Sequence, residues 1–252
     1  MPHISFSELK NWNFCPFYHK LTYIEKLKGF LGNEYTAFGT AIHDVCEKKI
    51  LQEQFDAAQH FIEKFASCLE ALDDSVEFRE KPEKMIAQGI NILPHIMPAV
   101  EQFFKDGYEV FSTEEQLMVP IDEEYNFKGY IDAVIKTPDG KYHIIDWKSC
   151  SWGWDMRKRA DPMVTYQLTL YKIFFAKKHD IDLKDIETHF ALLKRTAKKN
   201  IVEIFRVTSG NKKQENASTL LNKALFNIKK KRFIKDRRSC AKCEFHKTKE
   251  CP

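Results

Sequence analysis

The pattern of apolar positions is helical in the first part of the chain, changes to that of strands near residue 108, and later alternates between the two. Over 36–70 and 82–104, apolar side chains recur at the intervals of helices that bury one face. Pro94 and Pro98 are expected to interrupt the second segment. The rest is predicted, in chain order, as strands at 108–121, 125–136 and 141–148, a helix at 163–178, strands at 188–194 and 201–207, and a helix at 212–231.

This order of elements predicts an α/β fold with a central mixed β-sheet flanked by helices and a helical insertion near 50–105. With 252 residues, the chain is expected to form one domain, 1–252. Its 43% hydrophobic and 30% charged residues are ordinary for a globular protein and exclude a disordered chain. No apolar stretch is long enough for a membrane span, and the first residues lack a secretory pattern. We therefore expect a cytoplasmic protein without a membrane partner.

Acidic residues interrupt two of the apolar strands. Asp132 and Asp146 lie on strands that the turn Pro138-Asp139-Gly140 would join, so the two carboxylates are expected side by side. Asp146 and Lys148 are two residues apart and leave one face of their strand. Two buried carboxylates need a cation, and a divalent ion with oxygen ligands would serve. The alternative is a salt bridge between Lys148 and one aspartate at the sheet edge.

Three further positions bear on the chemistry. His43 lies on a predicted helix with Glu47 one turn later, and it is either a nitrogen ligand that would favour manganese or a hydrogen-bonded core histidine. Gln167 and Tyr171 share a helix face, where they either orient Lys148 or a phosphate, or belong to an ordinary amphipathic helix. Glu115, on the first predicted strand, is either an acid that supports the site or simply an exposed residue.

Taken in order, these motifs resemble the PD-(D/E)XK nuclease superfamily, and most of all its branch of RecB/AddB-type nucleases and CRISPR-associated Fe–S exonucleases. The matching positions are Gly39-Thr40 with His43, Gly129 with Asp132, Asp146-Trp147-Lys148, Gln167 with Tyr171, and Cys15-Pro16-Phe17-Tyr18. Each motif is weak alone, but their order is fairly specific. The resemblance implies a restriction-endonuclease-like core and DNA cleavage that depends on Mn²⁺ or Mg²⁺.

By the same resemblance, His43, Asp132, Asp146 and the backbone carbonyl of Trp147 would hold the metal. Lys148 would assist the attacking water, and Gln167 and Tyr171 would complete the catalytic set. Asp146 stands where the family more often has Glu, which shortens the reach of the carboxylate by one methylene. Single-stranded DNA is the expected substrate, with possible protein partners in recombination or DNA processing. The rival hypotheses are an inactive DNA-binding module with this fold and a regulatory Fe–S protein.

Three of the seven cysteines lie within the last thirteen residues, where they follow the spacing Cys240-x2-Cys243-x7-Cys251. The resemblance adds Cys15 as the fourth ligand of a 4Fe–4S cluster that would staple the C-terminal tail. The interval of seven residues between Cys243 and Cys251 is longer than the one usual in the family. His246 lies in that interval, so a zinc site without Cys15, or thiols without a ligand, are the alternatives. Cys46, Cys68 and Cys150 are expected to pack as small apolar side chains.

Two more features are candidates for contact with DNA. Seven of the ten residues from Lys229 to Arg238 are basic. If the protein is a nuclease, this run would bind phosphates through Lys229, Lys230, Lys231 and Arg232; the alternative is a solvated surface. Trp152 and Trp154 follow Lys148 closely, and they either stack on bases or form an aromatic mini-core.

Overall fold

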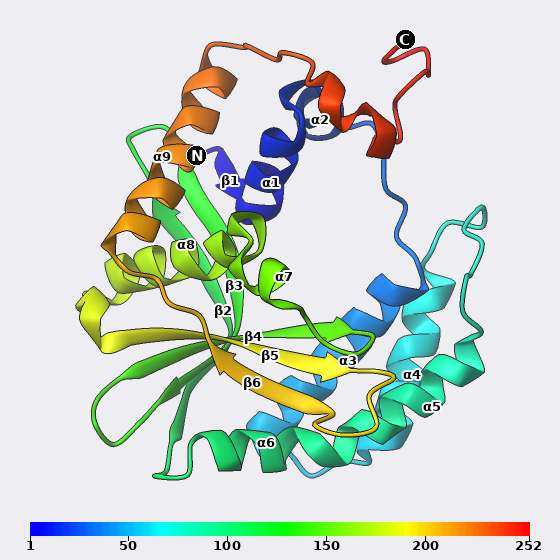
Figure 1. Ribbon diagram of the computed structural model, residues 1–252, viewed down its shortest axis with the longest axis vertical. Coiled ribbons are helices and arrows are strands. Elements are labelled where there is room, and N and C mark those ends of the chain that lie inside the picture. Colours follow the sequence, from blue (N-terminus) through cyan, green and yellow to red (C-terminus); the bar gives the residue numbers. More distant parts are fainter.

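The computed structural model describes the whole chain, residues 1–252, and has a six-stranded mixed sheet at its centre (Figure 1). Its strands are β1 (His3–Ser5), β2 (Glu109–Pro120), β3 (Asn126–Lys136), β4 (Tyr142–Cys150), β5 (Ile186–Lys194) and β6 (Val202–Arg206). They follow the order β1-β3-β4-β5-β6, and β2 also pairs with β3. β1 with β3 and β4 with β5 are parallel, whereas the other pairs are antiparallel.

Helices cover both faces of this sheet (Figure 1). The helices are α1 (Phe6–Phe14), α2 (Pro16–His19), α3 (Glu34–Ile50), α4 (Ala57–Glu70), α5 (Pro82–Ile92), α6 (Ile96–Phe103), α7 (Met156–Ala160), α8 (Pro162–His179) and α9 (Asn211–Lys229). Four short turns of 3₁₀ or π type complete the chain: η1 (Lys20–Ile24), η2 (Leu93–His95), η3 (Leu183–Asp185) and η4 (Arg237–Lys242). No helix combines the length and the apolar composition that crossing a membrane requires.

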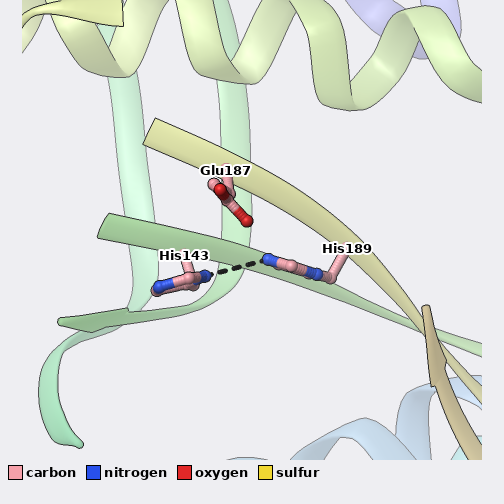
Figure 2. Close-up of side chains that lie close together, drawn as sticks. All are labelled: His143, Glu187 and His189. Atoms are coloured by element: carbon pink, nitrogen blue, oxygen red, sulfur yellow. Dashed lines mark hydrogen bonds between the residues drawn. The ribbon is translucent and has the colours of Figure 1, made fainter. Parts of the chain in front are cut away.

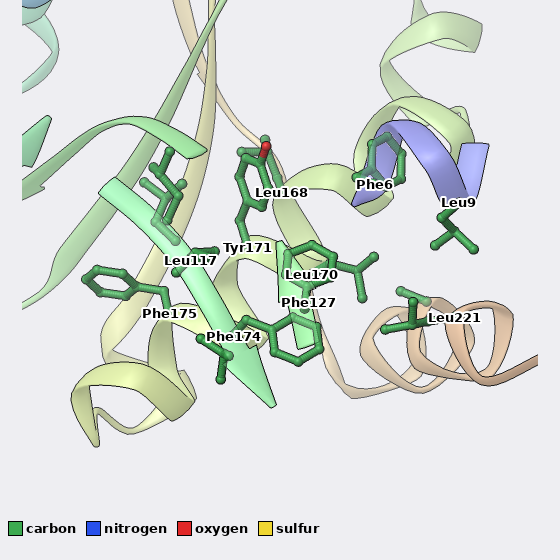
Figure 3. Packing of buried hydrophobic residues seen from close by; sticks show 14 of the residues in the cluster. Phe6, Leu9, Leu117, Phe127, Leu168, Leu170, Tyr171, Phe174, Phe175 and Leu221 are labelled. Carbon is green, nitrogen blue, oxygen red and sulfur yellow. The ribbon is translucent and has the colours of Figure 1, made fainter. Parts of the chain in front are cut away.

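Each face of the sheet has its own hydrophobic core. Alternation along β4 divides the side chains: Ile145 and Trp147 pack toward α3–α6, whereas Ile144 packs toward α1, α8 and α9. On the α8 side, the Phe127 and Phe174 rings stack with their centroids 4.2 Å apart, next to Tyr171 (Figure 3). Because β4 and β5 are covered on both faces, consecutive residues are buried over most of β5 and in the middle of β4.

Strands β3 and β4 separate at the residues that matter for function. Their pairing ends at Ala133 and Ile145, while β1 occupies the same edge of β3 only at 126–128. The stretch 129–132 therefore has no strand partner on that edge. Gly129 is required here, because a Cβ at this position would lie 2.7 Å from the Tyr171 ring. The sheet thus opens beside Asp132, with α8 close to the opening.

The predicted α/β fold with a mixed sheet flanked by helices is confirmed. The predicted strands and long helices are all present, and the segment from 50 to 105 is helical apart from its connecting turns. Pro94 lies in η2, which separates α5 from α6, whereas Pro98 lies in the first turn of α6, where a missing N–H is tolerated. Sequence reasoning missed β1 and α7, which are too short to show a period.

Candidate active site

The carboxylates of Asp132 and Asp146 lie where β3 and β4 part. Asp132 Oδ2 accepts a hydrogen bond of 2.7 Å from the backbone N–H of Trp147. This side chain therefore takes the place of the backbone pairing between β3 and β4, which ends at Ala133 and Ile145. Asp146 is 1% exposed, and its Oδ2 lies 2.5 Å from Lys148 Nζ. Lys148 therefore faces Asp146 on the same side of β4, as their spacing predicts. At these residues β4 pairs only with β5, because its pairing with β3 ends at Ile145, so the ion pair lies at a local edge of the sheet, as the salt-bridge alternative expects.

Both carboxylates are held in an electrostatically unfavourable place. Burial raises the pKa of Asp132 to about 6, and the Lys148 ammonium only partly opposes this. Burial likewise raises the pKa of Asp146 to about 6, with Lys148 again opposing and Asp132 adding to the rise. The buried Oδ2 of Asp146 makes no hydrogen bond of good geometry. Two carboxylates and one ammonium leave negative charge that a further cation would stabilise.

His43 approaches the carboxylates from α3. This helix begins at a capping box in which Asn33 and Thr36 bond each other's backbone N–H groups. His43 Nδ1 lies 3.6 Å from Asp132 Oδ2. Burial, followed by the nearby Lys148 charge, lowers the pKa of His43 to about 4, although Asp146 and the Trp147 backbone oppose this. The imidazole is therefore neutral at pH 7 and keeps a lone pair for a ligand.

Two more acids approach Asp132, and sequence reasoning did not assign them. Thr113 Oγ1 donates a hydrogen bond of 3.0 Å to Glu47 Oε1, which holds this carboxylate beside the site. Burial, and then the Asp132 charge, raises the pKa of Glu114. Glu114 adopts φ +44° at the β2 position that faces Asp132, and no sequence period reveals such a local irregularity.

Glu115, the acid that the sequence left open, lies away from this cluster. Its Oε1 is 2.5 Å from Lys178 Nζ and 2.8 Å from His179 Nε2. Because these partners end α8, Glu115 tethers that helix to β2. It is thus neither an exposed residue nor a neighbour of the aspartates.

Gln167 and Tyr171 lie on α8, beside the opening in the sheet. Gln167 Nε2 donates a hydrogen bond of 3.1 Å to the Tyr171 hydroxyl, as expected for residues one turn apart. Burial raises the pKa of Tyr171 well above its ordinary value, and the Asp146 charge adds to this. Tyr171 packs over Gly129, so the pair reaches the site from the α8 side (Figure 3).

The donor set suits a divalent cation of the Mg²⁺ or Mn²⁺ type. The buried carboxylate of Asp146, the largely buried carboxylate of Asp132, a neutral imidazole and the Trp147 carbonyl that faces His43 supply oxygen and nitrogen ligands. The ligand atoms of His43, Asp132 and Asp146 do not all come within 4.8 Å of one another. Lys148 and the Trp147 N–H hold the two carboxylates instead. To hold one ion together, these carboxylates would have to leave their present partners.

All four cysteines of the predicted cluster line one cavity of about 300 Å³. Cys15 comes from the junction of α1 and α2, and Cys240, Cys243 and Cys251 come from the C-terminal tail. The backbone N–H of Asp236 donates to Cys15 Sγ at 3.3 Å, so the two chain ends meet here. His246 lines the same cavity. Cys46, in contrast, is buried in the core on the α3 face.

The features considered for DNA contact differ in their surroundings. Trp152 is 77% exposed, whereas Trp154 packs edge-on against Phe190 and Phe205. Trp154 therefore belongs to an aromatic mini-core, whereas stacking on bases stays a prediction for Trp152. In the basic tail, Lys229 Nζ is paired with Asp122 at 2.8 Å and Glu124 at 3.0 Å. Lys230, Lys231 and Arg232 are exposed.

A groove borders the opening in the sheet on the side of β1 and α1. Lys26, Lys128, Tyr23 and Tyr130 line it together with Gly129 and Tyr171. Its volume is about 470 Å³. Tyr130 is 44% exposed, and its hydroxyl accepts a hydrogen bond of 3.2 Å from Gln116. Two lysines and three tyrosines thus surround a space that begins beside the Gln167–Tyr171 pair.

Comparison with known proteins places this architecture among solved structures. A candidate exonuclease from Eubacterium rectale has 14% identity, covers 93% of this chain and 84% of its own, and superposes with a TM-score of 0.61. The protein SSO0001 covers 96% of this chain and 83% of its own at 13% identity, with a TM-score of 0.44. LHK-Exo in complex with dAMP covers 82% of this chain and 98% of its own at 12% identity, with a TM-score of 0.29. No curated protein sequence matches the chain.

The first of these structures shares the fold of this protein, because a TM-score of 0.61 extends over most of both chains. A family model provides the stronger comparison. The model of the PD-(D/E)XK nuclease superfamily matches residues 3–248, which include every motif of the site from Cys15 to Tyr171. The chain therefore belongs to the PD-(D/E)XK nuclease superfamily.

Proposed function

We propose that the protein is a metal-dependent deoxyribonuclease, an exonuclease that hydrolyses phosphodiester bonds of single-stranded DNA with Mn²⁺ or Mg²⁺. One observation carries this proposal. Asp146 is buried and Asp132 is 16% exposed; each has a pKa of about 6 and lies near Lys148, where the sheet opens. A protein gains no stability from such carboxylates without a cation, so the arrangement makes sense as a site that binds one.

Each side chain has a role in this proposal. His43, Asp132, Asp146 and the Trp147 carbonyl would hold the ion, which supplies stabilisation of charge on the phosphate oxygens. Lys148 would orient the attacking water and the scissile phosphate. Gln167 and Tyr171 would position the phosphate from the α8 side, because their polar groups lie beside the Asp146 carboxylate.

The proposed preference for a single strand rests on the surfaces around the site. Exposed aromatic rings stack on the bases of any sequence once these are unpaired, while lysines follow the backbone. Trp152 supplies an exposed indole four residues after Lys148, and the groove beside Tyr171 supplies Tyr130, Lys26 and Lys128. The C-terminal Lys230, Lys231 and Arg232 would add contacts to phosphates that carry no base information.

Changing Lys148→Ala should lower the cleavage rate by about 10²- to 10⁴-fold, the range expected when a group that positions or activates water is lost. Metal binding should persist, since the ligands are on other side chains. Lys184→Ala is the matched control, because Lys184 is exposed and pairs only with Asp182. Cleavage of end-labelled DNA and calorimetric titration with Mn²⁺ would measure both effects. A normal rate in Lys148→Ala would reduce this lysine to a salt-bridge partner.

Metal affinity should fall as the pH drops below about 6. Asp132 and Asp146 then take up the protons that the ion must displace, at a cost of about tenfold in affinity per pH unit for each proton. His43 has a pKa of about 4 and does not limit binding in this window. Mn²⁺ titrations at pH 5, 6, 7 and 8 would measure the slope. An affinity that is equal at pH 5 and pH 8 would contradict the ligand assignment.

The cysteine cavity supports a 4Fe–4S cluster more than a zinc ion. All four cysteines line one cavity, and each thiolate of a four-iron cluster binds a different iron, so a cluster would use Cys15 together with the three cysteines of the tail. The zinc alternative with His246 would leave Cys15 without a ligand. We therefore propose a structural cluster held by Cys15, Cys240, Cys243 and Cys251.

A further inference from the structure

His143, Glu187 and His189 lie together on the sheet, at a place that the catalytic proposal does not use (Figure 2). His143 on β4 is the register partner of Glu187 on β5, and His189 follows two residues later on the same face. In the whole chain, they form the one group of three or more His, Cys, Asp or Glu whose ligand atoms all lie within 4.8 Å of one another.

The hydrogen bonds around His143 fix how its ring is protonated. Thr137 Oγ1 donates to Asp139 Oδ1 at 2.5 Å, so the same hydroxyl must accept from His143 Nε2 at 2.9 Å. His143 Nδ1 therefore has a lone pair, and His189 Nε2 donates to it across 3.0 Å. His189 Nδ1 is buried without a partner. Burial lowers the pKa of both rings, that of His189 to about 3, so both are neutral at pH 7.

This arrangement is close to what a metal ion needs. Two nitrogens bound at about 2.05 Å in tetrahedral geometry lie about 3.3 Å apart, compared with the 3.0 Å between the two rings here. The ion would replace the proton that the rings share, and this proton would pass to His189 Nδ1. Thr137 and Asp139 would then hold the outer nitrogen of His143, the supporting arrangement that metal-binding histidines usually have.

Glu187 would complete the site. Its Oε1 lies 3.2 Å from Arg206 Nη2 and 3.6 Å from Lys141 Nζ, while its other oxygen makes no hydrogen bond in the protein. The three side chains line a solvent-accessible pocket of about 440 Å³, together with Phe103, Phe104 and Arg206. An ion can therefore enter, and water can fill a fourth position.

We propose that His143, Glu187 and His189 form a second metal site, which takes zinc or another divalent first-row transition metal. It is separate from the catalytic carboxylates: Asp146 is three positions after His143, so their side chains leave opposite faces of β4. His143 instead contacts Phe104, just after α6, with ring centroids 5.1 Å apart. Two imidazoles and one carboxylate favour such ions over Mg²⁺. The bound ion would fasten β4 to β5 at the ends where both strands begin.

The direct test is a zinc titration of the protein, residues 1–252, after divalent ions have been removed and with all cysteines unaltered, followed by NMR of the imidazole nitrogens. Zinc should shift the signals of His143 and His189, and equilibrium dialysis should count one zinc that His143→Gln or Glu187→Gln loses. Thr137→Val should weaken this zinc by about 10- to 100-fold. His95→Gln and Glu215→Gln are controls on exposed surface positions.

The titration separates the possible outcomes even if a buried variant folds poorly, since the NMR readout uses the unaltered protein. Unchanged signals of both rings at saturating zinc would overturn the proposal, as would an equal zinc content in Glu187→Gln and Glu215→Gln. A response of both rings to Mg²⁺ equal to that for zinc would overturn the proposed class of ion. None of these results depends on DNA cleavage, so the second site can fail while the nuclease proposal stands.

Discussion

Asp132→Asn is expected to abolish DNA cleavage, with a loss of at least about 1,000-fold, while the fold is retained. The substitution removes a charged ligand of the proposed ion, and stabilisation by such an ion amounts to several kcal/mol, where each 1.36 kcal/mol is tenfold in rate. Asn keeps an oxygen in the place of Asp132 Oδ2, so the Trp147 N–H retains its acceptor. The loss can therefore be attributed to charge and not to a broken backbone contact.

The same variant should be at least as stable as the unaltered protein when metal is absent. The folded-state pKa of about 6 lies above the ordinary 3.8, so folding binds protons between these values, and stability falls as the pH rises through this window. Two pKa units correspond to about 2–3 kcal/mol, and Asn removes this cost at pH 7. Urea unfolding in EDTA at pH 4–8 would measure the change. Asp74→Asn, at an exposed surface position, is the matched control.

Two results would contradict this explanation. Cleavage at the normal rate by Asp132→Asn would show that the carboxylate is not a ligand. A loss of cleavage together with lower stability in EDTA would show that Asp132 mainly supports the fold, and the raised pKa would then have no functional meaning.

Cys15→Ala is expected to remove the iron as completely as Cys240→Ala, although the two cysteines lie at opposite ends of the sequence. The protein purified without oxygen should be brown and contain ~4 iron per chain, and either variant should be colourless. The reason is geometric, since Cys15 lines the same cavity as Cys240, Cys243 and Cys251. Loss of the cluster should also lower the melting temperature, because the C-terminal tail then loses its covalent links to Cys15 and keeps weaker contacts such as the small hydrophobic cluster around Phe245.

Cys68→Ala provides the control, since Cys68 on α4 packs against the core of the α3 face and is remote from the cavity in its contacts. It should keep both the colour and the iron. A colourless protein that binds one zinc and is indifferent to Cys15→Ala would instead support the site that includes His246.

The sequence predicts most of the fold because each long element buries one or both of its faces. Burial of one face gives a periodic pattern of apolar residues, and burial of both faces gives a continuous apolar run. The pairing of Asp146 with Lys148 and of Gln167 with Tyr171 follows from regular geometry, two residues along a strand and four along a helix. Glu114 could not be found in this way, since its approach to Asp132 depends on a backbone irregularity within β2. The same holds for His143 and His189, which meet only through the parallel register of β4 and β5.

Glu115 and Lys229 show a second limit of sequence reasoning. An acid beside a catalytic motif and a lysine in a basic run both suggest function, yet Glu115 binds Lys178 and His179, and Lys229 binds Asp122 and Glu124. Partners of this kind come from distant elements, so only the folded chain reveals which charges are already neutralised.

Digestion of end-labelled single- and double-stranded DNA, with Mn²⁺, with Mg²⁺ or with EDTA, tests the central claim most directly. The account predicts stepwise shortening of the single strand in Mn²⁺ or Mg²⁺, no cleavage in EDTA, and no cleavage by Asp132→Asn under any condition. Binding of DNA without cleavage by the metal-loaded protein would contradict it, and so would cleavage that continues unchanged in EDTA.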